Sequence, residues 1–178
     1  MVDVQTIGVL VTAASVSVAA FYYVMMVRFT QRNMRVALTT TLIGNISDEK
    51  AWRTWLELLY MEWSDYDDFE KKYGTDMGGA GMDNASKRLA VWNYYEVIGN
   101  LLRRGLVDRE TLYDAQAVWS AYIWLKFRSV IEGHRIRYAG KDAYGGFEYL
   151  VGEMLKMKSE RDPSYKIPEN FAKYIPEK

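Results

Sequence analysis

The fold is decided by a run without any charged residue, VQTIGVLVTAASVSVAAFYYVMMV, which spans residues 4–27. As a helix rising about 1.5 Å per residue, this run would extend roughly 36 Å, and the hydrocarbon core of a bilayer is about 30 Å thick. Asp3 precedes the run and Arg28 ends it, while Tyr22 and Tyr23 lie near its end, where aromatic rings favour the headgroup level. The run predicts a transmembrane anchor over residues 1–27.

Two other interpretations of this run stay open. A cleaved signal peptide needs a basic segment, a short apolar core and small residues at the cleavage site. Here Asp3 precedes the run, and bulky Phe21 and Met25 lie where small residues are needed. A buried helix of a soluble domain would normally carry a polar face, which this run lacks.

The charges that flank the run predict its orientation. Arg28, Arg32 and Arg35 follow the run, whereas only Asp3 precedes it. Basic residues are enriched on the cytoplasmic side of membrane helices. We therefore expect a single-pass protein of the cell membrane, with its N-terminus outside and its C-terminal part in the cytoplasm.

Small residues recur along one side of the predicted membrane helix. Gly8, Thr12, Ser15 and Ala19 follow one another at spacings of four, three and four. Such a line of small side chains lets a second helix approach closely, although small residues are also common in membrane helices in general. The line predicts packing against another membrane-protein subunit or a second copy of the chain.

The rest of the sequence predicts helices and no strand, so the fold class is all-α. We expect a juxtamembrane helical extension over residues 28–46, a compact cytoplasmic helical bundle over 47–160 and a proline-containing tail over 161–178. Residues 83–104 and 108–133 are expected to form an antiparallel hairpin of two long helices, because about three residues join them. Residues 75–82 are expected to form a loop. The expected helix ends are Ser47, Asp83 and Asp108 as N-caps and Gly74, Gly105 and Gly133 as terminators.

Composition excludes several kinds of chemistry. The chain has 178 residues, with 23 Lys and Arg against 23 Asp and Glu, so its formal net charge is zero and gives no basis for nucleic-acid binding. It has no cysteine and one histidine, His134. Disulfides, iron–sulfur clusters, a cysteine nucleophile and a multi-histidine metal site within this chain are thereby excluded. We predict no cofactor, metal site or catalytic residue.

One polar cluster lies in an otherwise apolar helix. Asn93, Glu96, Asn100 and Arg103 recur at steps of three and four. A buried glutamate needs a partner, which Arg128, Arg135 or Arg137 could supply. We interpret the cluster as a structural network that fixes the register of the helices, with a functional pocket as the alternative.

Other ionisable groups have simpler explanations. Asp65, Asp67 and Asp68 lack the loop pattern of an EF-hand, and acids are favoured at a helix N-terminus. His134 follows a predicted helix end, where a lone histidine is more often a surface residue than a catalyst.

Two stretches carry a family resemblance. One is VWNYYEVIGNLLRRGLVD at residues 91–108, which continues to Leu112-Tyr113-Asp114, and the other is FEYL at residues 147–150. Together with the single N-terminal span, they resemble the DUF4760 family over about residues 1–158. The resemblance implies a membrane-anchored helical domain. It implies no activity and no catalytic residues.

These observations predict a non-catalytic accessory or interaction subunit of a larger membrane assembly. The small-residue line, the aromatic content of 15% and the aromatic residues of the proline-containing tail all favour contacts with a partner. The alternatives are a small-molecule sensor or enzyme with a pocket near Glu96, and a sensor of anionic lipid that uses Arg28, Arg32 and Arg35.

Overall fold

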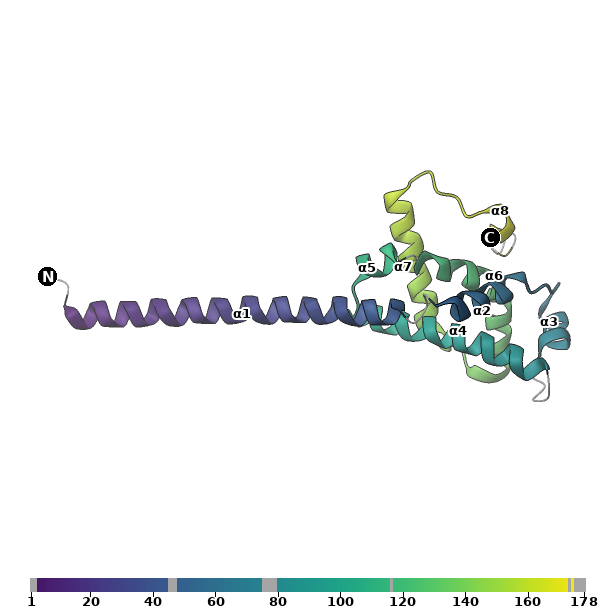
Figure 1. Ribbon diagram of the computed structural model, residues 1–178, viewed down its shortest axis with the longest axis horizontal. Coiled ribbons are helices and arrows are strands. Elements are labelled where there is room, and N and C mark those ends of the chain that lie inside the picture. Colours follow the sequence, from purple (N-terminus) through teal and green to yellow (C-terminus); the bar gives the residue numbers. More distant parts are fainter. Residues whose placement is uncertain (1–2, 45–47, 75–79, 116, 173, 175–178) are drawn as a thin grey trace.

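The structure is a computed structural model that describes residues 3–44, 48–74, 80–115, 117–172 and 174. Within these ranges the chain forms helices and no strand, which confirms the all-α prediction. A long first helix projects from a group of shorter helices (Figure 1). The elements are α1 (Val4–Gly44), α2 (Glu49–Tyr60), α3 (Tyr66–Tyr73), α4 (Ala80–Arg103), α5 (Arg109–Asp114), the 3-10 turn η1 (Ala117–Trp119), α6 (Ser120–His134), the π-helical turn η2 (Arg135–Ala139), α7 (Gly145–Arg161) and α8 (Glu169–Ala172).

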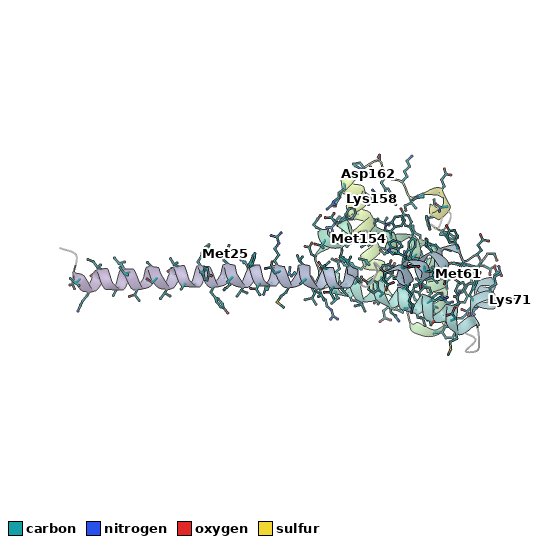
Figure 2. All side chains as sticks on the ribbon, viewed as in Figure 1. Met25, Met61, Lys71, Met154, Lys158 and Asp162 are labelled. Atoms are coloured by element: carbon teal, nitrogen blue, oxygen red, sulfur yellow. The ribbon has the colours of Figure 1, made fainter. Side chains whose placement is uncertain are left out.

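The first helix, α1, is the one described helix that is long and apolar enough to cross a membrane. Every side chain from residue 3 to residue 38 is exposed, and Figure 2 shows them radiating from the helix along its length. The helix continues past the apolar run to Gly44 without a break. About 16 Å of helix, the rise of eleven residues, separates Arg28 from Thr39.

The helical domain is attached at the last turns of α1. Thr39 is fully buried there, and its hydroxyl oxygen accepts a hydrogen bond of 2.9 Å from the backbone N–H of Asp108. The hydroxyl of Tyr94 donates to the backbone carbonyl of Leu42, and Leu42 and Ile43 pack against the core. These contacts fix the position of the domain at the end of the helix.

Aromatic side chains dominate the core of the domain. Trp92 of α4 and Phe127 of α6 meet edge to face, with ring centroids 5.6 Å apart, and Tyr95 stacks on Phe147 of α7 at 4.9 Å. Phe69 brings α3 onto the same core and is fully buried. Burial of such large rings away from water supplies most of the driving force for folding of the domain.

The closest helix pair is α4 with α7, which cross at two glycines. A Cβ atom built at Gly99 would lie 1.8 Å from the carbonyl oxygen of Gly146, and one built at Gly146 would lie 2.5 Å from the carbonyl oxygen of Glu96. No side chain fits between these two backbones. Glycine is therefore required at the crossing because it lets the helices come into backbone contact.

The predicted hairpin of two long helices is wrong. The connection after Arg104 leads into the short α5, and the chain turns again through η1 before α6 begins at Ser120. The principal partner of α4 is α7, which places Gly146 directly opposite Gly99. Two parts of the prediction hold: Gly105 follows α4 with a φ of +65°, and the side chain of Asp108 caps the next helix by accepting a hydrogen bond from the backbone N–H of Thr111.

Several helix ends also differ from those predicted. Asp83 lies inside α4 and pairs with Lys87, because α4 begins earlier, at Ala80, inside the predicted loop. Gly133 lies inside α6, where a Cβ atom would collide with the ring of Tyr66 at 2.4 Å. Residues 75–79 of the predicted loop and the predicted cap Ser47 lie outside the described residues, and the side chain of Asp48 caps α2.

Candidate functional site

The predicted polar cluster holds the beginning of α7. One carboxylate oxygen of Glu96 accepts a hydrogen bond of 2.8 Å from the backbone N–H of Phe147, and the other accepts one of 2.7 Å from the side-chain amide of Asn100. The first N–H groups of a helix lack partners within the helix, and a negative charge there is favourable. Glu96 thus satisfies the N-terminus of α7 next to the glycine crossing.

The other members of the cluster are placed differently. Arg103 donates to the carbonyl oxygen of Gly145 and lies 5.0 Å from the ring centroid of Tyr149, so it also contacts α7. Asn93 is exposed and takes no part in these hydrogen bonds. Glu96 and Arg103 therefore bind the start of α7 directly, and Asn100 orients the Glu96 carboxylate.

The arginine partners predicted for Glu96 are wrong. Arg128 pairs with Glu132, Arg135 with Glu148 and Arg137 with Asp67, at 2.8 to 2.9 Å. Glu96 instead meets backbone and amide donors, because α7 and not α6 packs along this side of α4.

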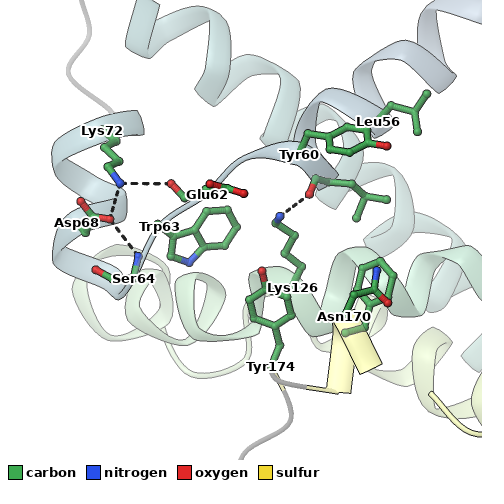
Figure 3. Close-up of a pocket in the computed structure, with 12 residues that line it drawn as sticks. Leu56, Tyr60, Glu62, Trp63, Ser64, Asp68, Lys72, Lys126, Asn170 and Tyr174 are labelled. Atoms are coloured by element: carbon green, nitrogen blue, oxygen red, sulfur yellow. Dashed lines mark hydrogen bonds and ion pairs between the residues drawn. The ribbon is translucent and has the colours of Figure 1, made fainter. Parts of the chain in front are cut away.

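A cavity of about 780 Å³ lies elsewhere, between α2, α3, α6 and the C-terminal segment, which comprises residues 165–172 and 174 (Figure 3). Its walls combine aromatic rings with charged and amide side chains. Figure 3 shows Trp63 between Asp68 on one side and Lys126 on the other, with Tyr174 below Lys126 and Asn170 to its right. The lining residues are Leu56, Leu59, Tyr60, Glu62, Trp63, Ser64, Asp68, Lys72, Lys126, Asn170, Phe171 and Tyr174.

The charges on one wall of this cavity are held by local hydrogen bonds. The Lys72 ammonium lies 2.8 Å from a carboxylate oxygen of Asp68, which also accepts a hydrogen bond of 3.0 Å from the backbone N–H of Ser64. The hydrogen bond from Lys72, followed by that from Ser64, holds the pKa of the Asp68 carboxyl below its ordinary value. The same ion pair raises the pKa of Lys72. Both groups therefore stay charged near neutral pH.

Lys126 forms part of the opposite wall although it is only 5% exposed. Its ammonium donates to the backbone carbonyl of Leu59 and lies 5.1 Å from the ring centroid of Trp63 and 5.8 Å from that of Tyr174. Contact with aromatic faces and a carbonyl dipole stabilises a cation away from water. Lys126 thereby joins α6, the end of α2 and the C-terminal segment.

The C-terminal segment covers α6. The ring of Phe171 in α8 lies 4.5 Å from that of Tyr122, and the hydroxyl groups of Tyr122 and Tyr165 are 3.1 Å apart. This segment supplies one wall of the cavity. The sequence pattern of the tail does not predict that it lies close to α2 or α3. The aromatic residues of the tail were the available signal, but they carry no information about which surface they contact.

Two further ionisable groups lie where α3, α4 and α6 meet. Arg88 is 3% exposed, with its guanidinium 4.7 Å from the ring centroid of Phe69, and it donates to the carbonyl oxygen of Tyr73 at 2.8 Å. His134 is half-buried beside Trp92, and burial lowers its pKa. Arg88 joins the end of α3 to α4, and His134 is neutral near pH 7.

The residues predicted on α1 all lie on its exposed surface. Gly8, Thr12, Ser15 and Ala19 contact no other described helix, and the hydroxyl of Ser15 donates to the carbonyl oxygen of Val11 at 2.8 Å. The basic residues beyond the apolar run, Arg28, Arg32 and Arg35, are exposed as well. The part of the chain that the structure describes contains no group of three or more acidic or histidine side chains placed to hold a metal ion.

The molecule is thus an aromatic-rich helical domain on a single helix that could span a membrane. The chain belongs to the DUF4760 family, since the model for this domain of unknown function matches residues 9–154. This match confirms the resemblance carried by residues 91–108 and 147–150. Neither the curated proteins nor the solved structures gave a match.

Proposed function

We propose that this protein is a single-pass membrane subunit whose cytoplasmic helical domain serves a larger membrane assembly without catalysing a reaction. Its N-terminus lies outside the cell and its domain in the cytoplasm. The basic residues that follow the apolar run support this orientation, since such residues are retained on the cytoplasmic side.

The observation that carries the proposal is the exposure of α1. Residues 3–38 bury no side chain against the domain, so the whole circumference of the apolar run is open to lipid or to another helix. Along its small-residue line, the hydroxyls of Thr12 and Ser15 donate to carbonyl oxygens one turn earlier, at 2.9 and 2.8 Å. A helix can therefore pack closely on this line without leaving a polar group unsatisfied.

A second surface of the domain also supports a partner. Trp52, Leu56 and Tyr60 follow one another at steps of four along α2, and all three are exposed, Tyr60 to 81%. Residues four apart share one face of a helix. Aromatic residues grouped on an exposed face are typical of protein interfaces.

The hydrogen bonds of the polar side chains support an accessory, non-catalytic role. Glu96 and Arg103 hold the start of α7, Asn100 donates to Glu96, and Asp68 accepts hydrogen bonds from Ser64 and Lys72. Each of these arrangements stabilises the fold. We therefore assign the domain to binding and positioning.

The experiment compares two serines of α1 in the full-length protein. Ser15 and Ser17 both donate to the carbonyl oxygen four residues earlier at 2.8 Å, but 200° of helix rotation separates them. Ser15→Leu places a bulky side chain on the small-residue line, and we expect it to abolish copurification of the partner from mild detergent. Ser17→Leu adds the same bulk on the opposite side and should leave the partner bound.

Either of two results would overturn the proposal. The wild-type protein could run as a monomer, without another membrane-protein subunit and without a second copy of itself. Alternatively, the protein could leave the membrane fraction on alkaline extraction, which would show that α1 does not span the bilayer.

The cavity of about 780 Å³ favours a second candidate function, a small-molecule sensor. Its volume falls in the range of known ligand pockets, and it combines aromatic walls with polar groups. A thermal-shift screen of metabolites and nucleotides tests it. A ligand that binds in this cavity should no longer raise the melting temperature of the Asn170→Ala and Tyr60→Ala variants. If no compound shifts the melting temperature of the wild-type protein, this function is contradicted.

A further inference from the structure

The three arginines beyond the apolar run share the side of α1 that carries the domain. Arg28, Arg32, Arg35 and Thr39 follow one another at steps of four, three and four, so their side chains fall within about 60° of rotation around the helix. Thr39 is buried against the domain through Asp108. The positive-inside rule accounts for the sign of these charges, but it does not account for their common side.

The domain places a further arginine and an apolar side chain close to this side of α1. Arg104 and Leu106 lie in the connection between α4 and α5, and both are exposed, Leu106 to 45%. This connection precedes Asp108, which contacts Thr39, and Figure 1 shows α5 beside α1 at the edge of the domain nearest the apolar run. We call Arg28, Arg32, Arg35 and Arg104 the basic corner.

The positive charge of the basic corner is only partly offset within the described part of the chain, by the carboxylate of Asp108 near Arg32 and Arg35. None of its four arginines lies within ion-pair distance of a carboxylate there. The acids of α5 are already paired, because Arg161 contacts both Glu110 and Asp114. Asp108, which lies near Arg32 and Arg35, uses its carboxylate to accept hydrogen bonds from Thr111.

The length of α1 brings this corner toward the bilayer surface. The apolar run of roughly 36 Å exceeds the hydrocarbon thickness of about 30 Å, and a helix of excess length adapts by tilting. Tilting toward the arginine side lowers the attached domain toward the headgroup layer. Arg104 and Leu106 belong to the part of the domain that lies beside α1, which is lowered first. Tilting the other way would lift the arginines away from the lipid phosphates.

We propose that the basic corner binds the phosphate headgroup of an anionic phospholipid and so holds the domain against the membrane surface. This inference rests on the membrane anchoring proposed above. Planar guanidinium groups bind phosphate through paired hydrogen bonds, and several that converge from two elements define a site where a single helix would give only a diffuse charge. Leu106 contacts the boundary between headgroups and acyl chains.

The test is a native mass-spectrometry titration of the full-length protein in mild detergent with phosphatidylglycerol and, separately, with zwitterionic phosphatidylcholine. We expect tighter binding of phosphatidylglycerol. Arg32→Gln with Arg35→Gln should weaken it about 30-fold, and Arg104→Gln alone about fivefold, if each arginine contributes about 1 kcal/mol. Arg28 is kept in all variants, because it helps to set the orientation.

The control variant removes two positive charges at other places. Arg53 and Lys71 are exposed, and Figure 2 shows Lys71 at the end of the domain far from α1. Arg53→Gln with Lys71→Gln should leave phosphatidylglycerol binding unchanged. Circular dichroism of each variant verifies that its helices are retained.

Three results would overturn the inference. The control could weaken binding as much as Arg32→Gln with Arg35→Gln, which would mean attraction by net charge. Arg104→Gln could have no effect, which would leave the domain out of the site. Inorganic phosphate could compete as well as the lipid, which would make free phosphate the ligand. In each case a protein that still copurifies with its partner would leave the proposed function intact.

Discussion

The two long helices α1 and α4 differ in how much of their surface is buried. From residue 3 to residue 38, α1 buries no side chain, whereas α4 buries Trp92, Tyr95 and Ile98 and comes into backbone contact with α7 at Gly99. In α1 the small residues lie on the surface, while in α4 the small residue lies at the tightest contact. The same kind of residue thus lies on an open surface in one helix and completes the core in the other.

The proposed membrane span accounts for the difference, because the two helices would then have different surroundings. A core helix must bury its apolar side chains against its own chain, because water surrounds the domain. A helix whose apolar residues face lipid gains nothing from burying them, so helix contacts there depend on close packing. Substitutions of small residues should therefore change stability in α4 and α7, and change association in α1.

The largest effect is expected at the crossing of α4 and α7. Gly99→Ala would place a Cβ atom 1.8 Å from the carbonyl oxygen of Gly146, so the helices must separate, at a cost of about 3 kcal/mol or more. Chemical unfolding followed by tryptophan fluorescence measures this loss. Gly152→Ala in the same α7 meets no atom within 4 Å and should stabilise the domain by about 0.5–1 kcal/mol. Equal effects of the two substitutions would mean that the crossing is not tight.

The next effect concerns the hydrogen bonds that hold the start of α7. Glu96→Ala leaves the backbone N–H of Phe147 and the amide of Asn100 without their acceptor, and should cost about 1–3 kcal/mol. Glu96→Gln keeps an acceptor and should cost less. Asn93→Ala, an exposed position in the same helix, serves as the control in the same unfolding experiment. If Glu96→Ala costs no more than Asn93→Ala, Glu96 does not hold α7.

A smaller effect is expected at Thr39, the first described residue of α1 that is buried against the domain. Thr39→Val removes the acceptor of the Asp108 N–H at a buried position, and should lower the unfolding free energy by about 1–2 kcal/mol. Thr40→Val alters the neighbouring exposed threonine, which also donates to the carbonyl oxygen four residues earlier. It should change stability little, and an equal loss would show that α1 is not fixed to the domain at Thr39.

The smallest effect is the pH dependence of the Asp108 cap. Hydrogen bonds from the hydroxyl and amide of Thr111, followed by the charges of Arg32 and Arg35, hold the pKa of the Asp108 carboxyl below its ordinary value. The charged form is therefore stabilised by folding, so its contribution is present above the unfolded pKa of about 4 and is lost as pH falls through the folded pKa. Asp108→Asn keeps a capping side chain without this titration.

Urea titrations of both proteins between pH 7 and pH 3 measure this contribution. The wild-type protein should be more stable than Asp108→Asn at pH 7 by less than about 1 kcal/mol. The difference should shrink as the pH falls. A difference that stays constant over this range would contradict the assigned role of the carboxylate.

What could be predicted from the sequence is what depends on local pattern. The uncharged run at residues 4–27, the apolar spacing of α4 and the glycine after Arg104 each lie in one segment, and the structure shows a helix or a helix end at each of them. The pairing of α4 with α7 depends on Gly99 and Gly146, which lie far apart in the chain. The apolar spacing of either helix does not indicate which helix it will contact.

The candidate sites show the same limit. The spacing of Glu96, Asn100 and Arg103 identified a polar cluster, but its partner is the backbone at the start of α7, which has no sequence signature. The cavity beside Trp63 joins segments from residue 56 to residue 174, so it exists only once α8 has packed on α6. Arg104 joins the basic corner for a similar reason, because Asp108 attaches the α4–α5 connection to Thr39.

The most direct test of the account is the accessibility of single cysteines, which the absence of native cysteine makes simple. Asp3→Cys lies before the apolar run and Lys71→Cys at the far end of the domain, and both positions are exposed. A membrane-impermeant maleimide should label Asp3→Cys in intact cells, and label Lys71→Cys only after the cells are permeabilised. Labelling of Lys71→Cys in intact cells, or equal protection of both positions, would contradict a single-pass protein with a cytoplasmic domain.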